Sequence, residues 1–423
     1  MRRIVWVLAA AVLALAGCGG AADEGSSDSS GGDGAPKSVP GFDGKTIKLG
    51  VLTPLSGPVA VIGNPLTAGN EVYFDALNEE KGGIAGKYKV ELVQQDTQYA
   101  PDKTVQQYNK IKGQVAMFTQ VLGTAPTLAV LPQLKRDGML AAPASLDAFW
   151  VREENLLPVG APYQIQAINS LDYFINEAGG KGKNICSFIQ DDAYGEAGQA
   201  GVDFAAEQLG FDVVDTQKFK AGDKDVTGQV QRLQRSKCDA VFLVATPTDA
   251  GTIWGTAAKL GFAPRWIGQS PSWIDELGAS PLAPYLKKTT WIAAEGTEWG
   301  DDSVEGMKTM VERVKKYKPD QQPDYYFAFG YNQATAVAAV LEKAVELGDL
   351  SHKGIIKASQ EVGTVSFGGL GGDYEYGTAE ARNPPRNTTI FEVDPDKPFG
   401  LGKLKYDFES DAAAKYEFKK ADL

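Results

Sequence analysis

The chain has 423 residues, too many for one ordinary hydrophobic core and enough for about two or three domains. Its hydrophobic content of 43% and aromatic content of 10% are typical of a folded globular protein. The formal net charge of −12 makes nucleic acids and anionic membrane surfaces poor partners.

Residues 1–18 have the three regions of a secretory signal. Arg2 and Arg3 form the charged start, an apolar run follows over 4–15, and small residues precede Cys18. This run is too short to span a bilayer as a helix. Leu-Ala-Gly-Cys at its end resembles a bacterial lipobox, which implies an extracytoplasmic protein that is lipid-anchored to the bacterial cell membrane through Cys18. The alternative is a simple signal that is cleaved nearby, with Cys18 incidental.

The segment 19–45 is rich in Gly, Ser and Asp and nearly free of apolar residues. Such a composition cannot bury a core, so we expect a disordered tether.

Cys186 and Cys238 are the remaining cysteines. Each lies at the start of an expected strand, and an oxidising compartment permits a disulfide between them. Either a disulfide or two inert buried thiols fits the sequence.

Strands and helices alternate after the tether. In the first unit we expect strands over 46–53, 89–95, 116–122 and 139–142, with helices over 64–80, 101–113 and 124–136. In the second unit we expect strands over 184–190, 211–217, 240–245 and 265–267, with helices over 194–209, 226–235 and 248–260. A strand over 290–295, helices over 302–317 and 327–347, and short strands after 364 follow. This order predicts an α/β protein with two doubly wound parallel sheets.

In such sheets, ligands bind beyond the carboxyl ends of the strands. Thr124 follows one of these strands and stands where a helix would begin, with Pro126 in the first turn. The free N–H groups of a helix start attract an anion such as a carboxylate. A plain helix cap is the alternative use of Thr124.

Several segments together resemble a known family, the extracytoplasmic solute-binding proteins of ABC importers in the leucine/isoleucine/valine-binding (branched-chain amino acid) branch. The segments are "IKLGVLTPLSGPVAVIG", "NEEKGGIAGKYKVELVQQDTQYAPDKTVQQYNKI", "GMLAAPAS", "DDAYGEAGQAG" and "YNQATAVAAVLEKA". They extend from about residue 46 to 365, and the residues beyond match poorly.

The resemblance implies a type I periplasmic-binding-protein fold, with two doubly wound parallel-sheet lobes joined by a three-stranded hinge. Lobe I would comprise 46–158 plus 295–364, and lobe II 159–294 plus 365–423. A small solute would be captured in the interlobe cleft and delivered by a monomer to ABC permease subunits with a cytoplasmic ATPase.

The resemblance also implies ligand-binding residues. Gly123 and Thr124 would bind the ligand carboxylate, Ala144 and Ser145 would offer a backbone carbonyl and a hydroxyl to the amino acid, and Tyr194 would close over the ligand from lobe II. Thr246, Ser270 and Trp273 lie on the other loops that face the cleft and complete the expected set: Gly123, Thr124, Ala144, Ser145, Tyr194, Thr246, Ser270 and Trp273.

Two positions depart from the family pattern. Leu146 stands where a Thr is expected, and Ser270 falls where amino-acid binders carry a Glu that pairs with the ammonium. A buried ammonium without a carboxylate is costly. Either Asp191, Asp192 or Asp249 substitutes for the Glu, or the ligand is an aromatic or aliphatic acid without an α-ammonium. Phe149, Trp150 and Trp273 could line such a site or pack in the core.

The sequence argues against an enzyme. Its only histidine is His352, so histidine-based triads and most zinc sites are not available. No Gly-x-Ser-x-Gly motif and no cysteine pair with metal spacing occurs, and we expect neither a metal nor a cofactor. A ligand-sensing protein that acts on a receptor is the remaining alternative.

Overall fold

The structure is a computed structural model that describes residues 39–420, all within one compact unit, Pro36–Leu423. The expected signal, Cys18 and residues 19–38 of the expected tether lie outside the described residues. The last part of that tether, 39–45, is packed: Val39 is buried, and the Phe42 ring meets the Tyr88 ring edge-on at 5.1 Å. A tether would therefore end near residue 38.

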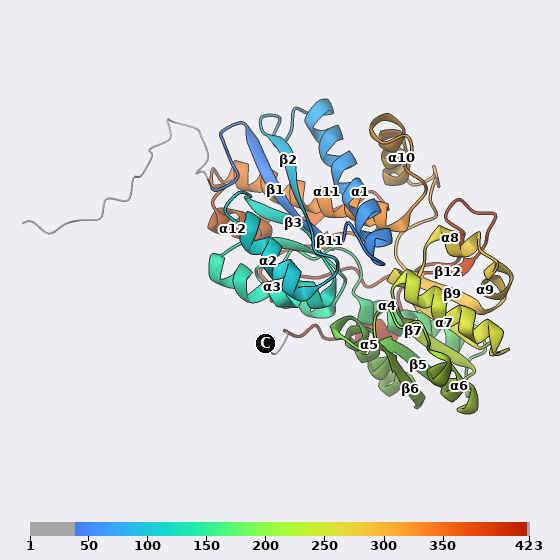
Figure 1. Cartoon of the computed structure of the whole chain (residues 1–423). Coiled ribbons are helices and arrows are strands. Elements are labelled where there is room, and N and C mark those ends of the chain that lie inside the picture. The colour runs from blue at the N-terminus through green and yellow to red at the C-terminus, as the bar shows by residue number, and fades with distance from the viewer. Residues whose placement is uncertain (1–38, 421–423) are drawn as a thin grey trace, which may run out of the picture. The chain divides into compact units, whose positions relative to one another are not determined.

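Lobe I is built on a four-stranded parallel sheet with the order β2-β1-β3-β4 (Figure 1). Helices α1 and α11 share one hydrophobic core with this sheet, and α2 and α3 share another. The elements are β1 (Thr46–Thr53), α1 (Ala60–Glu80), β2 (Lys89–Asp96), α2 (Pro101–Ile111), β3 (Met117–Leu122), α3 (Thr124–Asp137), β4 (Ala141–Ala144), α10 (Glu305–Tyr317), α11 (Tyr325–Glu346) and α12 (His352–Glu361).

Lobe II is built on a seven-stranded sheet with the order β13-β12-β9-β8-β7-β5-β6. Its strands are β5 (Ile185–Gln190), β6 (Val213–Phe219), β7 (Ala240–Val244), β8 (Arg265–Gln269), β9 (Thr290–Ala294), β12 (Thr388–Val393) and β13 (Leu401–Phe408). Its helices are α4 (Tyr163–Asp172), α5 (Ala193–Leu209), α6 (Thr227–Arg235), α7 (Pro247–Lys259), α8 (Asp275–Gly278), α9 (Ala283–Thr289) and α13 (Asp411–Ala414). A separate two-stranded sheet joins β10 (Thr364–Val365) and β11 (Tyr374–Glu375).

The predicted α/β fold with two doubly wound lobes is confirmed. Strands β3, β5 and β7 are buried along their whole length, as central strands covered on both faces should be. The C-terminal residues add a feature that the sequence did not predict in detail. Strand β12 pairs antiparallel with β9, and β13 pairs antiparallel with β12, so the lobe II sheet is mixed at one edge.

Helix α4 is absent from the predicted elements for a physical reason. All ten of its residues are buried, so it has no polar face and no amphipathic period. Within 39–420, none of the helices combines the length and the apolar character that crossing a bilayer requires.

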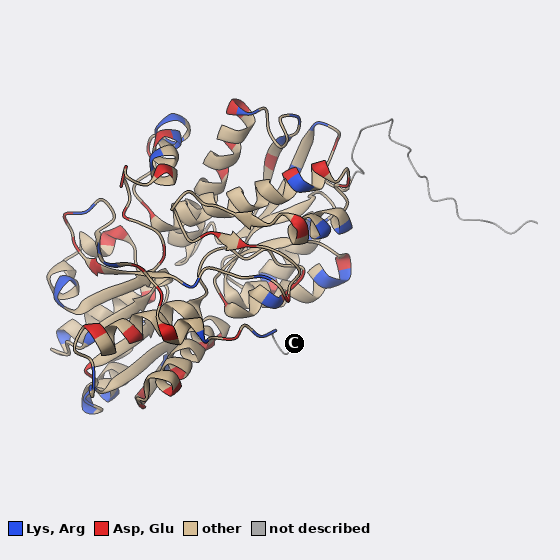
Figure 2. Ribbon diagram, turned by 180° about the vertical axis from the view of Figure 1, so that it is seen from behind, with Lys and Arg blue, Asp and Glu red and all other residues tan. Residues whose placement is uncertain are grey.

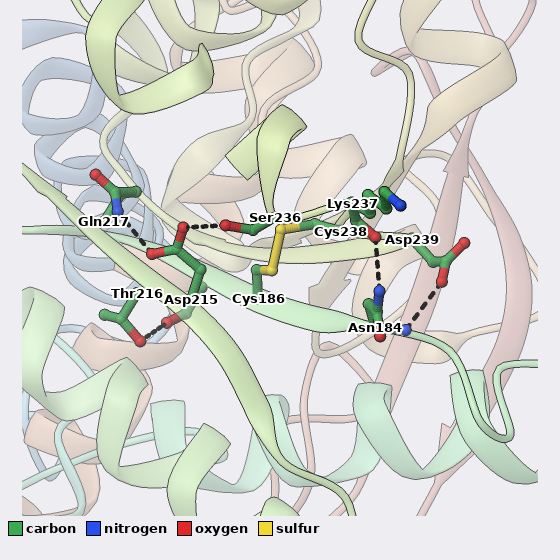
Figure 3. Close-up of a disulfide and its surroundings, with 10 residues drawn as sticks. Asn184, Cys186, Asp215, Thr216, Gln217, Ser236, Lys237, Cys238 and Asp239 are labelled. Atoms are coloured by element: carbon green, nitrogen blue, oxygen red, sulfur yellow. Dashed lines mark hydrogen bonds between the residues drawn. A yellow bond between two sulfur atoms is a disulfide. The ribbon is translucent and has the colours of Figure 1, made fainter. Parts of the chain in front are cut away.

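A disulfide joins Cys186 of β5 to Cys238, which lies two residues before the start of the neighbouring strand β7 (Figure 3). Both cysteines lie in the hydrophobic core formed with α6 and α7. Beside the bond, the Asn184 amide donates to the Lys237 carbonyl at 3.0 Å, and the Asn184 N–H donates to Asp239 at 2.9 Å. These bonds hold the chain before β7 against the start of β5.

We expect the double variant Cys186→Ala/Cys238→Ala to lose about 2–4 kcal/mol of unfolding free energy, because the bond closes a long loop in the unfolded chain. The sequence separation of the two cysteines is 52 residues. Urea denaturation followed by circular dichroism measures the loss. A reductant should destabilise the parent protein by a similar amount and leave the double variant unchanged. An equal effect of the reductant on both proteins would contradict this account.

Candidate functional site

The main candidate site is a cavity between the lobes, which we call the interlobe cavity. It lies where strands β3, β4, β7 and β8 end, as expected for sheets of this type. At its rim, the Thr248 hydroxyl of lobe II donates a hydrogen bond to the Pro58 carbonyl of lobe I at 3.2 Å. Its lining residues are Val59, Ile62, Leu66, Tyr99, Leu122, Gly123, Thr124, Ala144, Ser145, Leu146, Tyr163, Tyr194, Thr246, Ser270, Pro271, Tyr325, Tyr326 and Phe329.

Among the described residues, those that line the cavity are aliphatic, aromatic or hydroxyl-bearing, apart from Gly123. None of them is Asp, Glu, Lys or Arg. The charged residues of the chain are instead spread over the helices and loops of both lobes (Figure 2). A ligand in this cavity therefore meets neutral groups only.

The structure brings together seven of the eight residues that the sequence nominates, all except Trp273. Trp273 is buried in the lobe II core, where its indole N–H donates to the Phe399 carbonyl at 3.0 Å. Trp150 is likewise a core residue, and its indole N–H donates to the Ser145 hydroxyl at 2.9 Å. Phe149 packs against the same core and does not line the cavity.

The start of α3 presents unused hydrogen-bond donors to the cavity. The Gly123 N–H is occupied, because it donates to the Ala144 carbonyl at 3.2 Å. The N–H groups of Thr124 and Ala125 belong to the first turn of α3 and have no acceptor within the helix. The Thr124 hydroxyl is buried and has no partner among the described residues. These donors and the helix dipole favour an anion.

The other polar groups of the expected set are mostly occupied. The Ala144 carbonyl accepts from the Gly123 N–H, and the Thr246 hydroxyl donates to Asp249 at 3.1 Å. The Ser270 hydroxyl is buried and has no partner among the described residues, but it carries no charge.

None of the three aspartates that could replace the expected Glu lines the cavity. Asp191 lies 3.6 Å from the Lys218 ammonium. Asp192 caps helix α5 by accepting from the Tyr194 and Gly195 N–H groups. Asp249 accepts from the Gly222 N–H at 3.0 Å as well as from Thr246. A bound ammonium would therefore lack a carboxylate partner.

The sequence interpretation missed four tyrosines that line the cavity: Tyr99, Tyr163, Tyr325 and Tyr326. Burial raises the pKa of all four hydroxyls above the usual range, so they stay protonated at neutral pH. Tyr325 and Tyr326 open α11, and the run "DYYFAFGYN" was a signal that could have nominated them.

Tyr99 and its neighbour Gln98 have positive φ values of 61° and 52°, which are strained for residues with side chains. A methyl group on Gly123 would lie 2.6 Å from the Tyr99 ring. The strained turn therefore places this ring directly over the start of α3.

A family model described as "Periplasmic binding protein" matches residues 46–398. The chain belongs to this family. Family membership implies an extracytoplasmic location.

Named relatives differ in their ligands. The Leu/Ile/Val-binding protein of Citrobacter freundii is 25% identical over 282 residues, which cover 65% of this chain and 74% of that protein. A fatty acid ABC transporter substrate-binding protein from Thermomonospora curvata has a TM-score of 0.85 and 28% identity, covering 91% of this chain and 98% of that one. A branched chain amino acid ABC transporter from Thermus thermophilus with bound valine has a TM-score of 0.77 and 19% identity, covering 88% of this chain and 98% of that one. At this identity the similarity shows only that the two chains share a fold.

A second cavity adjoins the first in this periplasmic binding protein. Its lining residues are Ser270, Trp273, Ile292, Ala294, Glu295, Thr297, Glu298, Trp299, Met307, Asp324, Tyr325, Ala328, Phe329, Leu370, Phe391, Phe399 and Leu401.

Glu295 lies between β9 of lobe II and α10 of lobe I, in one of the segments that connect the lobes, which we call crossings. Its carboxylate accepts at 2.9 Å from the N–H of Ala161, which lies in the crossing between β4 and α4. A methyl group on Gly160 would lie 2.4 Å from this carboxylate, and one on Gly371, which lies between α12 and β12, would lie 3.5 Å away. Burial raises the pKa of Glu295 to about 7. The Glu295 carboxyl group is therefore a buried acid that lies among the crossings.

We expect Glu295→Gln to stabilise the protein at about pH 8 and to have little effect at about pH 5. The unfolded side chain ionises near its ordinary value of 4.5, whereas the folded one ionises near 7, so the ionised form costs stability only as pH rises through this window. The gain at the higher pH is up to about 3 kcal/mol. Urea denaturation at the two pH values measures it.

Glu298→Gln is the matched control with the opposite sign. Partial burial raises the pKa of Glu298, but hydrogen bonds from Lys397 and the Lys403 N–H outweigh it and lower the pKa. The control should lose stability at neutral pH. A Glu295→Gln variant that also loses stability at about pH 8 would show that the ionised carboxylate is favourable there.

Proposed function

We propose that this periplasmic binding protein is the ligand-binding component of an ABC importer and that its ligand is a carboxylic acid with an apolar body and no α-ammonium. The protein would act as a lipid-anchored monomer through Cys18 and deliver the ligand to permease subunits that work with a cytoplasmic ATPase. The observation that carries the ligand class is the uncharged lining of the interlobe cavity around the start of α3.

The polar end of the ligand would lie at the start of α3. A carboxylate there would accept from the Thr124 hydroxyl and from the N–H groups of Thr124 and Ala125. This arrangement supplies hydrogen bonds without a positive side chain, in the way that helix N-termini hold anions in many proteins. Tyr194 faces this region from lobe II, where its hydroxyl donates to the Ala245 carbonyl at 3.4 Å.

The apolar part of the ligand would contact the aliphatic and aromatic lining. Val59, Ile62 and Leu66 approach from α1 and the turn before it, and Leu146 adds an isobutyl group where the family resemblance places a hydroxyl. Cavities with an apolar wall and a few polar anchors are typical of small-molecule sites. The fatty acid ABC transporter substrate-binding protein of Thermomonospora curvata, which is similar over nearly the whole chain, supports this ligand class.

Binding would also favour closure of the cleft. The lining comes from both lobes, so a ligand gains its full set of contacts only when both lobes surround it. A ligand that binds the closed state better shifts the population toward it. The closed form would then be the one that the permease recognises.

Calorimetric titration of the purified protein with octanoate and with leucine tests the ligand class. We expect octanoate to bind and leucine to bind more weakly or not at all, because the leucine ammonium would be buried without a partner. Binding of leucine in preference to octanoate would overturn the proposed ligand class.

Thr124→Val tests the placement of the carboxylate. The variant keeps the size of the side chain but removes the hydroxyl, so octanoate affinity should fall by about 1.5–3 kcal/mol, or roughly 10- to 150-fold. Thr124→Ser keeps the hydroxyl and is the matched control, with affinity close to that of the parent protein. Equal affinities of the Val variant and the parent protein would place the carboxylate elsewhere.

A further inference from the structure

The interlobe cavity and the second cavity are neighbours in space. They share three lining residues, Ser270, Tyr325 and Phe329. Tyr325 and Phe329 are one turn apart on α11, and Ser270 follows β8 of lobe II. These three residues therefore form the boundary between the two cavities.

Most of the second cavity is lined by large apolar side chains from both lobes. Trp273, Ile292, Phe391, Phe399 and Leu401 belong to lobe II and pack in its core. Lobe I and the crossings contribute Met307 of α10, Ala328 and Phe329 of α11, and Leu370. This wall suits an apolar occupant.

The acidic side chains of the second cavity are bound by the chain itself. Glu295 accepts from the Ala161 N–H at 2.9 Å, and Asp324 accepts from the Phe327 N–H at 3.0 Å. Glu298 accepts from the Lys397 ammonium at 2.9 Å and from the Lys403 N–H at 2.8 Å. These carboxylates therefore already form hydrogen bonds with other groups of the same chain.

The state of the carboxyl groups also favours an apolar occupant. Burial raises the pKa of both Glu295 and Asp324 to about 7, so much of each carboxyl is neutral near neutral pH.

We infer that the second cavity is the binding site for the distal part of an unbranched alkyl chain whose carboxylate lies at the start of α3. The ligand class is thereby narrowed to fatty acids that are long enough to pass Ser270, Tyr325 and Phe329. This inference rests on the proposed function, because it needs the carboxylate at Thr124.

A series of straight-chain acids tests the inference by calorimetric titration: hexanoate, octanoate, decanoate and laurate, each kept below its micelle-forming concentration. Every methylene that is newly buried should tighten binding by about fourfold. We expect the affinity to keep rising to the longest acid. A plateau at hexanoate would show that the chain stops in the interlobe cavity and would overturn the inference.

Ala328→Phe fills the second cavity from α11. We expect the variant to weaken laurate binding at least about tenfold, since several methylenes lose their site, and to change hexanoate binding less than about twofold. Retained hexanoate binding also shows that the variant folds. Leu370→Trp fills the cavity from another element and should have the same selective effect.

Ala339→Phe is the matched control, because it places the same ring on α11 about three turns away, outside both cavities. It should leave the whole affinity series unchanged. If Ala328→Phe and Leu370→Trp both bind laurate as the parent protein does, the inference is overturned. Failure of every acid to bind the parent protein would instead overturn the proposed function itself.

Discussion

The close approach of helices α1 and α11 is the constraint on which both cavities depend. A methyl group on Gly330 would lie 1.9 Å from the Leu66 carbonyl oxygen, and one on Gly69 would lie 2.1 Å from the Phe327 carbonyl oxygen. Neither position accepts a side chain without a shift of the backbone. The two helices therefore meet along their backbones, and the apolar residues beside this contact, Leu66 and Phe329 among them, are held at the cavity wall.

Helix α11 has a second role because it begins at the border of the two cavities. Asp324 caps the helix, and the next residues, Tyr325 and Tyr326, both line the interlobe cavity. The Tyr326 hydroxyl donates to the Trp273 carbonyl at 2.7 Å, which ties this lobe I helix to lobe II. Buried ionisable groups gather in the same region, and Glu295 lies among the crossings. Part of the energetic cost of burying ionisable groups therefore falls where the lobes meet.

The sequence predicted the fold well and the site in part. The central parallel strands of both sheets could be predicted because they are continuous apolar runs, and seven nominated residues do line the interlobe cavity. Helix α4 could not be predicted, because a helix that is buried on all sides lacks the period on which such predictions depend. The second cavity could not be predicted either, since its wall combines residues from 270 to 401 that only the folded chain brings together.

The aromatic residues show why the type of a residue could not by itself predict whether its side chain lines the cavity. Trp150, Trp273 and Tyr325 all follow or begin elements that point toward the cleft, yet Trp150 packs in the lobe I core and only Tyr325 lines the interlobe cavity. Their positions are decided by side-chain packing between elements that are distant in sequence. Periodicity and loop position carry no information about that packing.

A binding protein recognises the carboxylate and the ammonium of an amino acid with different kinds of group. This difference explains how one fold can accept different ligands. The anion site at α3 is made largely of backbone N–H groups and the helix dipole, so it persists as long as the helix begins at Thr124. Recognition of an ammonium depends on a carboxylate side chain, which a single substitution removes. With Ser270 where the family resemblance places a Glu, and with Leu146 adding apolar surface nearby, the cavity keeps its anion site and loses its partner for a cation. Under the proposed ligand class, the loss of that one charge would move the preference of this fold from amino acids toward simple carboxylic acids.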